Sequence, residues 1–183
     1  NLKKSIEIAK KIRSRGISIP IVLMTYFNPI NTYGLEKLAA DAAETGIDGF
    51  IIPDLPPEEA DEFESLCEDK GLAIIYLLSP ASSAERIKLV ASRASGFIYM
   101  VSLTGVTGAR DTLSDGLQDF ISRVRAETNL PLAVGFGIGN GEQASAVADW
   151  ADGVIVGSAF VKLANKKDGK FTQLAKEIVD GVT

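Results

Sequence analysis

Two short segments late in the chain combine glycine with small polar residues in a way that suits a bound phosphate. Gly135-Phe136-Gly137 ends one apolar run, and Val156-Gly157-Ser158 ends another. Glycine has no Cβ, so the backbone N–H groups beside it can approach an anion closely. We predict that amides at these two ends hold a phosphate at a helix start, although two plain tight turns would have the same residues. The predicted phosphate residues are Gly108, Gly137, Gly157 and Ser158.

The titratable side chains limit the acid–base chemistry that is open to this chain. It contains no histidine and one cysteine, so proton transfer must use carboxylates, tyrosine or lysine, and we expect no metal site. Asp54 is the most conspicuous carboxylate. It acts either as a base, as a partner that orients a base or a loop, or as a cap for the turn before the helix that opens with Pro56-Pro57. Cys67 falls in a helical pattern and is predicted to be a core residue.

Residues 96–110 are the third stretch that suggests a site. They begin as the apolar run of a buried strand and continue as a loop with two glycines and two threonines. Tyr99 lies on the strand, where its flat ring could stack on an aromatic substrate. The loop that ends at Arg110 could fold over the site as a lid. A core strand followed by a flexible loop is the alternative.

Composition bounds the class of protein. The length of 183 residues predicts a single domain spanning 1–183. A hydrophobic content of 46% and a mean hydropathy of +0.15 are typical of a globular chain, and no apolar run reaches the roughly 20 residues that span a bilayer. A net charge of −5 argues against nucleic acid as the main partner. One cysteine cannot form an internal disulfide, which fits a reducing compartment, and we expect a cytoplasmic protein.

Apolar runs and helical patterns alternate along the whole chain. The predicted strands are 19–24, 49–53, 72–78, 96–102, 131–135 and 153–156. The predicted helices are 1–15, 35–44, 58–70, 84–94, 113–128, 141–151, 160–164 and 171–179. Residues 25–29 are assigned to the loop at the end of the first strand. Because near-continuous apolar strands alternate with helices, the pattern indicates a parallel α/β protein.

An internal echo favours a closed barrel over an open doubly wound sheet. Residues 47–52 (IDGFII) resemble residues 151–156 (ADGVIV), as two similar halves of a barrel would, although Asp-Gly at a strand start is also common turn chemistry. A (β/α)8 barrel needs eight strands, and the pattern here contains six. We therefore expect about six of eight β/α units, corresponding to strands 3–8, with two units preceding Asn1.

Five motifs in order resemble the tryptophan synthase alpha subunit, and the match runs over essentially the whole chain. They are MTYFNPI (24–30), IPDLPPEE (52–59), VSLTGVTGAR (101–110), VGFGI (134–138) and ADGVIVGSA (151–159). The resemblance implies a TIM barrel that cleaves indole-3-glycerol phosphate, by a retro-aldol reaction, into indole and glyceraldehyde 3-phosphate. It also implies an α2β2 complex for tryptophan biosynthesis, in which pyridoxal phosphate (PLP) belongs to the beta subunit and the alpha subunit has no cofactor.

The resemblance also assigns roles to residues. Thr107 belongs to a loop that closes over the substrate, and Asp54 supports that closed state. The family's two catalytic acids, a glutamate and an aspartate, fall before Asn1, so no catalytic residue is assigned in this chain. Phosphate is assigned to Gly108, Gly137, Gly157 and Ser158, and the indole ring to Met24, Ile51, Tyr99 and Phe136.

Three functions remain open at this point. The chain is a C-terminal part of a lyase that is inactive alone, a non-catalytic partner that modulates a PLP-dependent beta subunit, or a stand-alone indole-3-glycerol phosphate lyase.

Overall fold

The structure, a computed structural model, describes residues 1–101, 110–135, 137–164, 166 and 168–182, with the backbone alone at 110–115. The chain divides into two compact units. Unit 1 consists of Asn1–Leu77 and Arg93–Gly96, and unit 2 consists of Leu78–Ser92 and Phe97–Thr183. That residues 1–183 form one domain stays a prediction.

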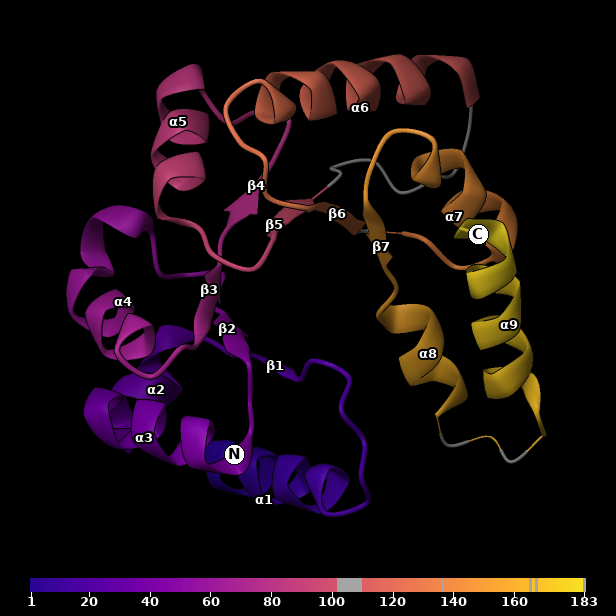
Figure 1. Ribbon diagram of the computed structural model, residues 1–183. Helices are drawn as coiled ribbons and strands as arrows, with labels where there is room; N and C mark the ends of the chain where they lie inside the picture. The colour runs from indigo at the N-terminus through magenta and orange to yellow at the C-terminus, as the bar shows by residue number, and fades with distance from the viewer. Residues whose placement is uncertain (102–109, 136, 165, 167, 183) are drawn as a thin grey trace. The chain divides into compact units, whose positions relative to one another are not determined.

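Unit 1 is built on a three-stranded parallel sheet. Its strands β1 (Val22–Met24), β2 (Gly49–Ile51) and β3 (Ala73–Ile75) are neighbours in that order (Figure 1). The helices of the unit are α1 (Leu2–Arg13), α2 (Phe27–Tyr33), α3 (Leu35–Thr45), the short 3-10 helix η1 (Pro57–Glu59) and α4 (Asp61–Glu68). The ring centroids of Phe50 on β2 and Phe63 on α4 lie 5.4 Å apart, and both side chains are fully buried. This aromatic pair joins helix to sheet in the core of the unit.

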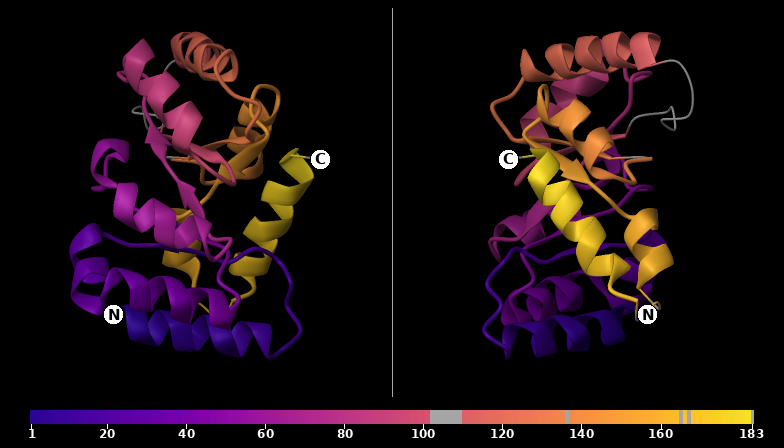
Figure 2. Two further views of the ribbon diagram at one scale, coloured as in Figure 1. Left: turned by 60° about the vertical axis from the view of Figure 1, so that its left-hand side comes forward. Right: turned by 90° about the vertical axis from the view of Figure 1, so that its right-hand side faces the viewer.

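Unit 2 contains most of a second sheet. The strands β4 (Leu77–Leu78), β5 (Ile98–Val101), β6 (Leu132–Gly135) and β7 (Gly153–Ile155) follow one another in chain order, with β5, β6 and β7 parallel. The helices are α5 (Ala84–Arg93), α6 (Arg110–Arg125), α7 (Gly141–Ala148), α8 (Ser158–Leu163) and α9 (Lys170–Val182). Two further views show α9 running past both α7 and α8 (Figure 2). Fully buried Met100, Phe120 and Leu132 form the core of this unit.

The alternation predicted from the sequence is confirmed, with three differences. The predicted helix 58–70 is divided at Ala60 into η1 and α4. The predicted strand 72–78 is split at Tyr76 into β3 and β4, which belong to different sheets. Residues 27–33 form α2, where the sequence analysis assigned a loop at 25–29. The Asn28-Pro29 pair looks like a turn signal, but Pro29 is the third residue of the helix. Proline is tolerated in the first turn, because the N–H it lacks has no partner there.

The first Asp-Gly of the internal echo holds three segments of unit 1 together. The carboxylate of Asp48 accepts the backbone N–H of Ile21 at 2.6 Å and a guanidinium N–H of Arg13 at 2.6 Å. Arg13 is the last residue of α1, and it also donates to the carbonyl oxygen of Gly46 at 2.8 Å. We call this arrangement an aspartate clamp. It fixes a helix end and the beginnings of two adjacent strands.

The second Asp-Gly repeats the clamp in unit 2. The carboxylate of Asp152 accepts the backbone N–H of Leu132 at 2.8 Å and is ion-paired with Arg125, the last residue of α6. Arg125 also donates to the carbonyl oxygen of Leu130 at 2.9 Å. The backbone N–H of Leu132 and then the guanidinium of Arg125 hold the pKa of Asp152 below its ordinary value. The echo in the sequence therefore has a hydrogen-bonding role in each unit.

Asp152→Asn should destabilise the protein because it removes the charge from this clamp. We expect the free energy of unfolding at neutral pH to fall by about 1 kcal/mol, since the carboxylate is half exposed and its ion pair is screened. A lowered native pKa contributes stability above the unfolded-state value of about 3.9, and this contribution is lost as the pH falls through the native pKa. Urea unfolding should therefore show a gap between wild type and variant that narrows in acid.

Asp149→Asn is the matched control, because Asp149 is exposed at the end of α7. Equal stability of Asp152→Asn and wild type at neutral pH would contradict the role assigned to the clamp.

Candidate functional site

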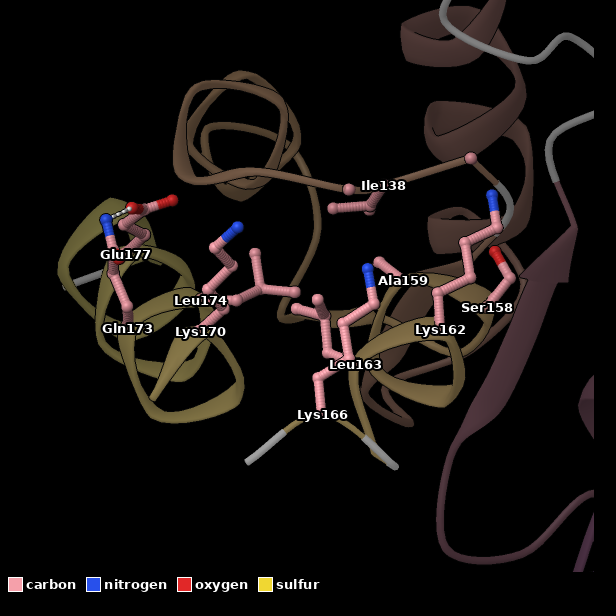
Figure 3. A pocket seen from close by; sticks show the side chains of 12 residues that line it. Ile138, Ser158, Ala159, Lys162, Leu163, Lys166, Lys170, Gln173, Leu174 and Glu177 are labelled. Carbon is pink, nitrogen blue, oxygen red and sulfur yellow. Dashed lines mark hydrogen bonds between the residues drawn. The ribbon is translucent and has the colours of Figure 1, made fainter. Parts of the chain in front are cut away.

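A hollow of about 750 Å³ lies in unit 2 at the carboxyl ends of β6 and β7 (Figure 3). The loop between β6 and α7 forms one side, and α8 and α9 form the others. The lining residues are Gly137, Ile138, Gly139, Ser158, Ala159, Lys162, Leu163, Lys166, Lys170, Gln173, Leu174 and Glu177. Two predicted phosphate residues, Gly137 and Ser158, thus border the same hollow.

The loop between β6 and α7 is held in place by local hydrogen bonds. Gly137 has a φ of +81°, in the left-handed region that favours glycine. The side chain of Asn140 caps α7 by accepting the backbone N–H of Gln143 at 2.9 Å. The side-chain oxygen of Gln143 accepts the N–H of Gly139 in return, at 2.8 Å. The side chain of Ile138 is buried, which fixes the loop just after Gly137.

The start of α8 is open toward a ligand. Gly157 is its N-cap and has no side chain that could accept the first-turn N–H groups. A Cβ added at Gly157 would meet no atom within 4 Å, so the space in front of this turn is free. Ser158 is the first residue of the helix, and its side chain borders the hollow. A helix start without a side-chain cap and with open space in front of it suits an anion.

The wall formed by α9 depends on a close approach of two glycines. A Cβ at Gly141 would lie 2.4 Å from the carbonyl oxygen of Glu177, and one at Gly181 would lie 2.5 Å from that of Gly141. Any larger residue would push α9 away from α7. The ring centroids of Phe160 on α8 and Phe171 near the start of α9 lie 5.0 Å apart. This aromatic pair joins α8 to α9.

Tyr99 packs against a glycine of the neighbouring strand. It lies on β5 opposite Ala133 of β6, and its ring occupies the space where a side chain at Gly135 would lie. A Cβ there would be 2.5 Å from both the Cε2 and the Oη of Tyr99. Burial raises the pKa of the Tyr99 hydroxyl. Gly135 is therefore a packing requirement of Tyr99, which the sequence analysis did not anticipate.

Two residues that the resemblance assigns to the indole ring lie in unit 1. Met24 at the end of β1 is paired in register with Ile51 of β2. The side chain of Met24 is 59% exposed, whereas that of Ile51 is 8% exposed, so only Met24 presents much surface to a ligand. Their contact with an indole ring stays a prediction.

Asp54 holds the start of α2. Its carboxylate accepts the backbone N–H of Phe27 at 2.8 Å. The helix that begins at Pro57 has no side-chain cap, so the alternative that Asp54 caps that turn is wrong. Cys67 is fully buried, as predicted, and burial raises the pKa of its thiol to about 12. A role for Asp54 in a closed state stays a prediction.

Three further site residues lie outside the described residues, namely Thr107, Gly108 and Phe136. Sequence reasoning also missed lysines. Lys162 and Lys166, which were not assigned to the site from the sequence, both line the hollow. Part of the signal was present in the spacing, because Lys162 follows Ser158 by four residues, which is one turn of α8.

The parallel strands, the helices between them and a site at the strand ends define this chain as an α/β protein of the TIM-barrel class. Residues 1–181 match the family model described as tryptophan synthase alpha chain. The chain belongs to the tryptophan synthase alpha chain family.

Relatives and solved structures agree with this family. The chain is 50% identical over 164 residues to the tryptophan synthase alpha chain of Geobacter sp. (strain M21), covering 90% of this chain and 61% of the relative. It is 48% identical over 175 residues to that of Methanosarcina barkeri, covering 93% and 66%. It thus spans about three fifths to two thirds of the length of these curated relatives.

Two solved structures extend the comparison to the fold. Tryptophan synthase from M. tuberculosis is similar at a TM-score of 0.88 with 32% identity, covering 100% of this chain and 68% of that one. Tryptophan synthase subunit alpha from Legionella pneumophila is similar at 0.85 with 33% identity, covering 100% and 70%. No helix among the described residues has the length and apolarity to cross a membrane.

Gly135→Ala should be strongly destabilising for its size, because the new methyl group would collide with the ring of Tyr99. We expect the free energy of unfolding to fall by about 1–3 kcal/mol, the usual cost of overpacking. Gly153→Ala on β7 is the matched control, since a Cβ there would lie 3.9 Å from that of Ala133, an ordinary contact. Urea unfolding of both variants measures the difference. A Gly135→Ala protein as stable as Gly153→Ala would show that the Tyr99 ring is placed elsewhere.

Proposed function

We propose that the protein cleaves indole-3-glycerol phosphate into indole and glyceraldehyde 3-phosphate in tryptophan biosynthesis. We propose further that the residues of this chain bind the substrate. Membership of the tryptophan synthase alpha chain family supports the reaction. The observation that carries the binding role is the hollow that Gly137 and Ser158 border together.

The phosphate is proposed to lie against the backbone amides of Gly137, Gly157 and Ser158, with Gly108 as a fourth contact. The open space in front of Gly157 and the uncapped first turn of α8 support this position. Phosphate oxygens accept hydrogen bonds from such N–H groups, and the helix dipole favours a negative charge there. The phosphate would anchor the substrate while the bond between carbons is broken elsewhere.

The indole ring is proposed to contact Tyr99, Phe136, Met24 and Ile51, each on the basis of the resemblance. The packing of Tyr99 against Gly135 supports a fixed orientation of that ring, which an aromatic substrate needs for stacking. Thr107 is proposed to act in loop closure, with Asp54 in a supporting role. The hydrogen bond from Phe27 keeps the carboxylate of Asp54 in place.

Proton transfer is proposed to rely on the family's two acids, which the resemblance places outside these residues. The partner is proposed to be a tryptophan synthase beta subunit in an α2β2 complex, which would hold the PLP and consume the indole. Several of the similar solved structures are of tryptophan synthase from M. tuberculosis, which supports that partner. We also propose a cytoplasmic location, supported by a single, buried cysteine.

Gly157→Val should weaken phosphate binding without disturbing the fold. The side chain enters open space, so it clashes with the incoming anion rather than with the protein. Loss of one charge-assisted hydrogen bond costs about 1.5–3 kcal/mol, so titration calorimetry with indole-3-glycerol phosphate should show roughly 10- to 150-fold weaker binding. Gly116→Val on α6, which also meets no atom within 4 Å, is the control and should bind normally. Unchanged affinity in Gly157→Val would mean that the anion lies elsewhere.

An indole-release assay tests the division between binding and proton transfer. The 183-residue chain should bind indole-3-glycerol phosphate and release no indole above the buffer rate, because the acids are assigned outside it. Adding a tryptophan synthase beta subunit should not restore release, since that partner supplies no acid to this reaction. Rapid release by the chain would overturn the assignment of the acids, and failure to bind would overturn the proposed substrate.

A further inference from the structure

The proposed phosphate site contains no charged side chain, although its ligand is an anion. Gly108, Gly137, Gly157 and Ser158 are all neutral, whereas a phosphate monoester carries nearly two negative charges at neutral pH, its second pKa being about 6. Backbone amides can bind such a group but do not neutralise it. A phosphate at this site therefore needs positively charged side chains nearby to balance its negative charge.

Lysines from two helices and the loop between them surround the hollow. Lys162 lies one turn after Ser158 on α8, so both side chains are on the same face of the helix. Figure 3 shows the amino groups of Lys162, Lys166 and Lys170 all pointing toward the side of the hollow formed by the loop that carries Ile138. The three amino groups thus face the loop that follows β6, each at a different place along the hollow.

The charge balance of the hollow is opposite to that of the whole chain. Three lysines and one carboxylate, that of Glu177, line it, while the chain has a net charge of −5. The carboxylate of Glu177 accepts a hydrogen bond from Gln173 at 3.0 Å, and Lys170 lies 3.7 Å from Asp168. Neither Lys162 nor Lys166 forms an ion pair with any residue in the described part of the chain. These two lysines give the hollow a positive potential.

We propose that Lys162 is a phosphate-binding residue of this site, with Lys166 as a second cation that raises the local potential. This inference rests on the proposed function, and it assigns to Lys162 the positive charge that the glycine and serine residues of the site lack. The site then selects a dianionic phosphate monoester over a monoanion, since the neutral amides alone discriminate weakly between the two. The flexible stem of lysine lets the ammonium group follow the phosphate as it enters between the glycine loop and α8.

An alternative role for Lys162 follows from its place in the last turn of α8, where a cation stabilises the helix through its dipole. That role predicts a change in stability and none in anion affinity. Because Lys162 is exposed, a role in binding predicts a strong dependence on salt. Measuring both the stability of the protein and its affinity for phosphate therefore distinguishes a helix-stabilising role of Lys162 from a binding role.

Lys162→Met removes the charge and keeps the length of the side chain. Titration with inorganic phosphate at low ionic strength should show about tenfold weaker binding, and the loss should shrink at high salt. The loss should also be larger at about pH 8, where inorganic phosphate is mainly the dianion, than at about pH 5, where it is mainly the monoanion. Lys162→Arg should restore most of the affinity. Lys176→Met, at an exposed position of α9 outside the hollow, is the matched control and should bind phosphate normally.

The outcomes separate this inference from the proposed function. Phosphate affinity within twofold of wild type in Lys162→Met, with Gly157→Val impaired, overturns the assignment of Lys162 and leaves the phosphate site in place. An equal loss in Lys176→Met overturns it too, because the effect would then be one of overall charge. If the unmodified protein binds neither inorganic phosphate nor indole-3-glycerol phosphate, the site and the inference both fail.

Discussion

The register between β6 and β7 is the constraint on which the site depends. Asp152 ties the amino ends of these strands together through the N–H of Leu132, and the two strands then run in parallel with Gly135 opposite Ile155. Gly137 follows Gly135 by two residues, and Gly157 follows Ile155 by two residues. A shift of one residue in this pairing would move one of them out of line and turn the side chains of that strand to the opposite face of the sheet. A carboxylate at one end of the sheet therefore sets the position of the proposed anion site at the other end.

Several glycines at the walls of the site are needed because another part of the chain lies very close to them, rather than because the backbone there is flexible. The ring of Tyr99 fills the place of a side chain at Gly135, and α9 approaches α7 where Gly141 meets Gly181. A Cβ atom at any of these glycines would collide with the neighbouring chain and force the two parts to separate. Gly157 differs from these, because the space in front of it is empty of protein. The same residue type thus serves packing at three positions and leaves room for a ligand at the fourth.

Charge is distributed differently in the two kinds of cluster that this chain contains. In the aspartate clamps, Arg13 and Arg125 are each paired with a carboxylate and bound to backbone carbonyls, so they stabilise the fold. In the hollow, Lys162 and Lys166 extend toward the loop at Gly137 (Figure 3). The paired arginines lie at the amino ends of strands and the lysines near the carboxyl ends, where parallel α/β folds place their binding sites.

The sequence alone determined the alternation of strands and helices, the pairing of the glycine motifs with strand ends, and the family, because these depend on local pattern and on residue identity. It failed at α2, where a first-turn proline imitates a loop, and at Tyr76, where one apolar run divides between two sheets. Only the tertiary structure decided that Asp54 holds α2, that Gly135 makes room for Tyr99 and that lysines surround the hollow. The first two depend on contacts between residues distant in the chain, which no local pattern encodes. The hollow itself forms only where α8 and α9 meet the loop after β6.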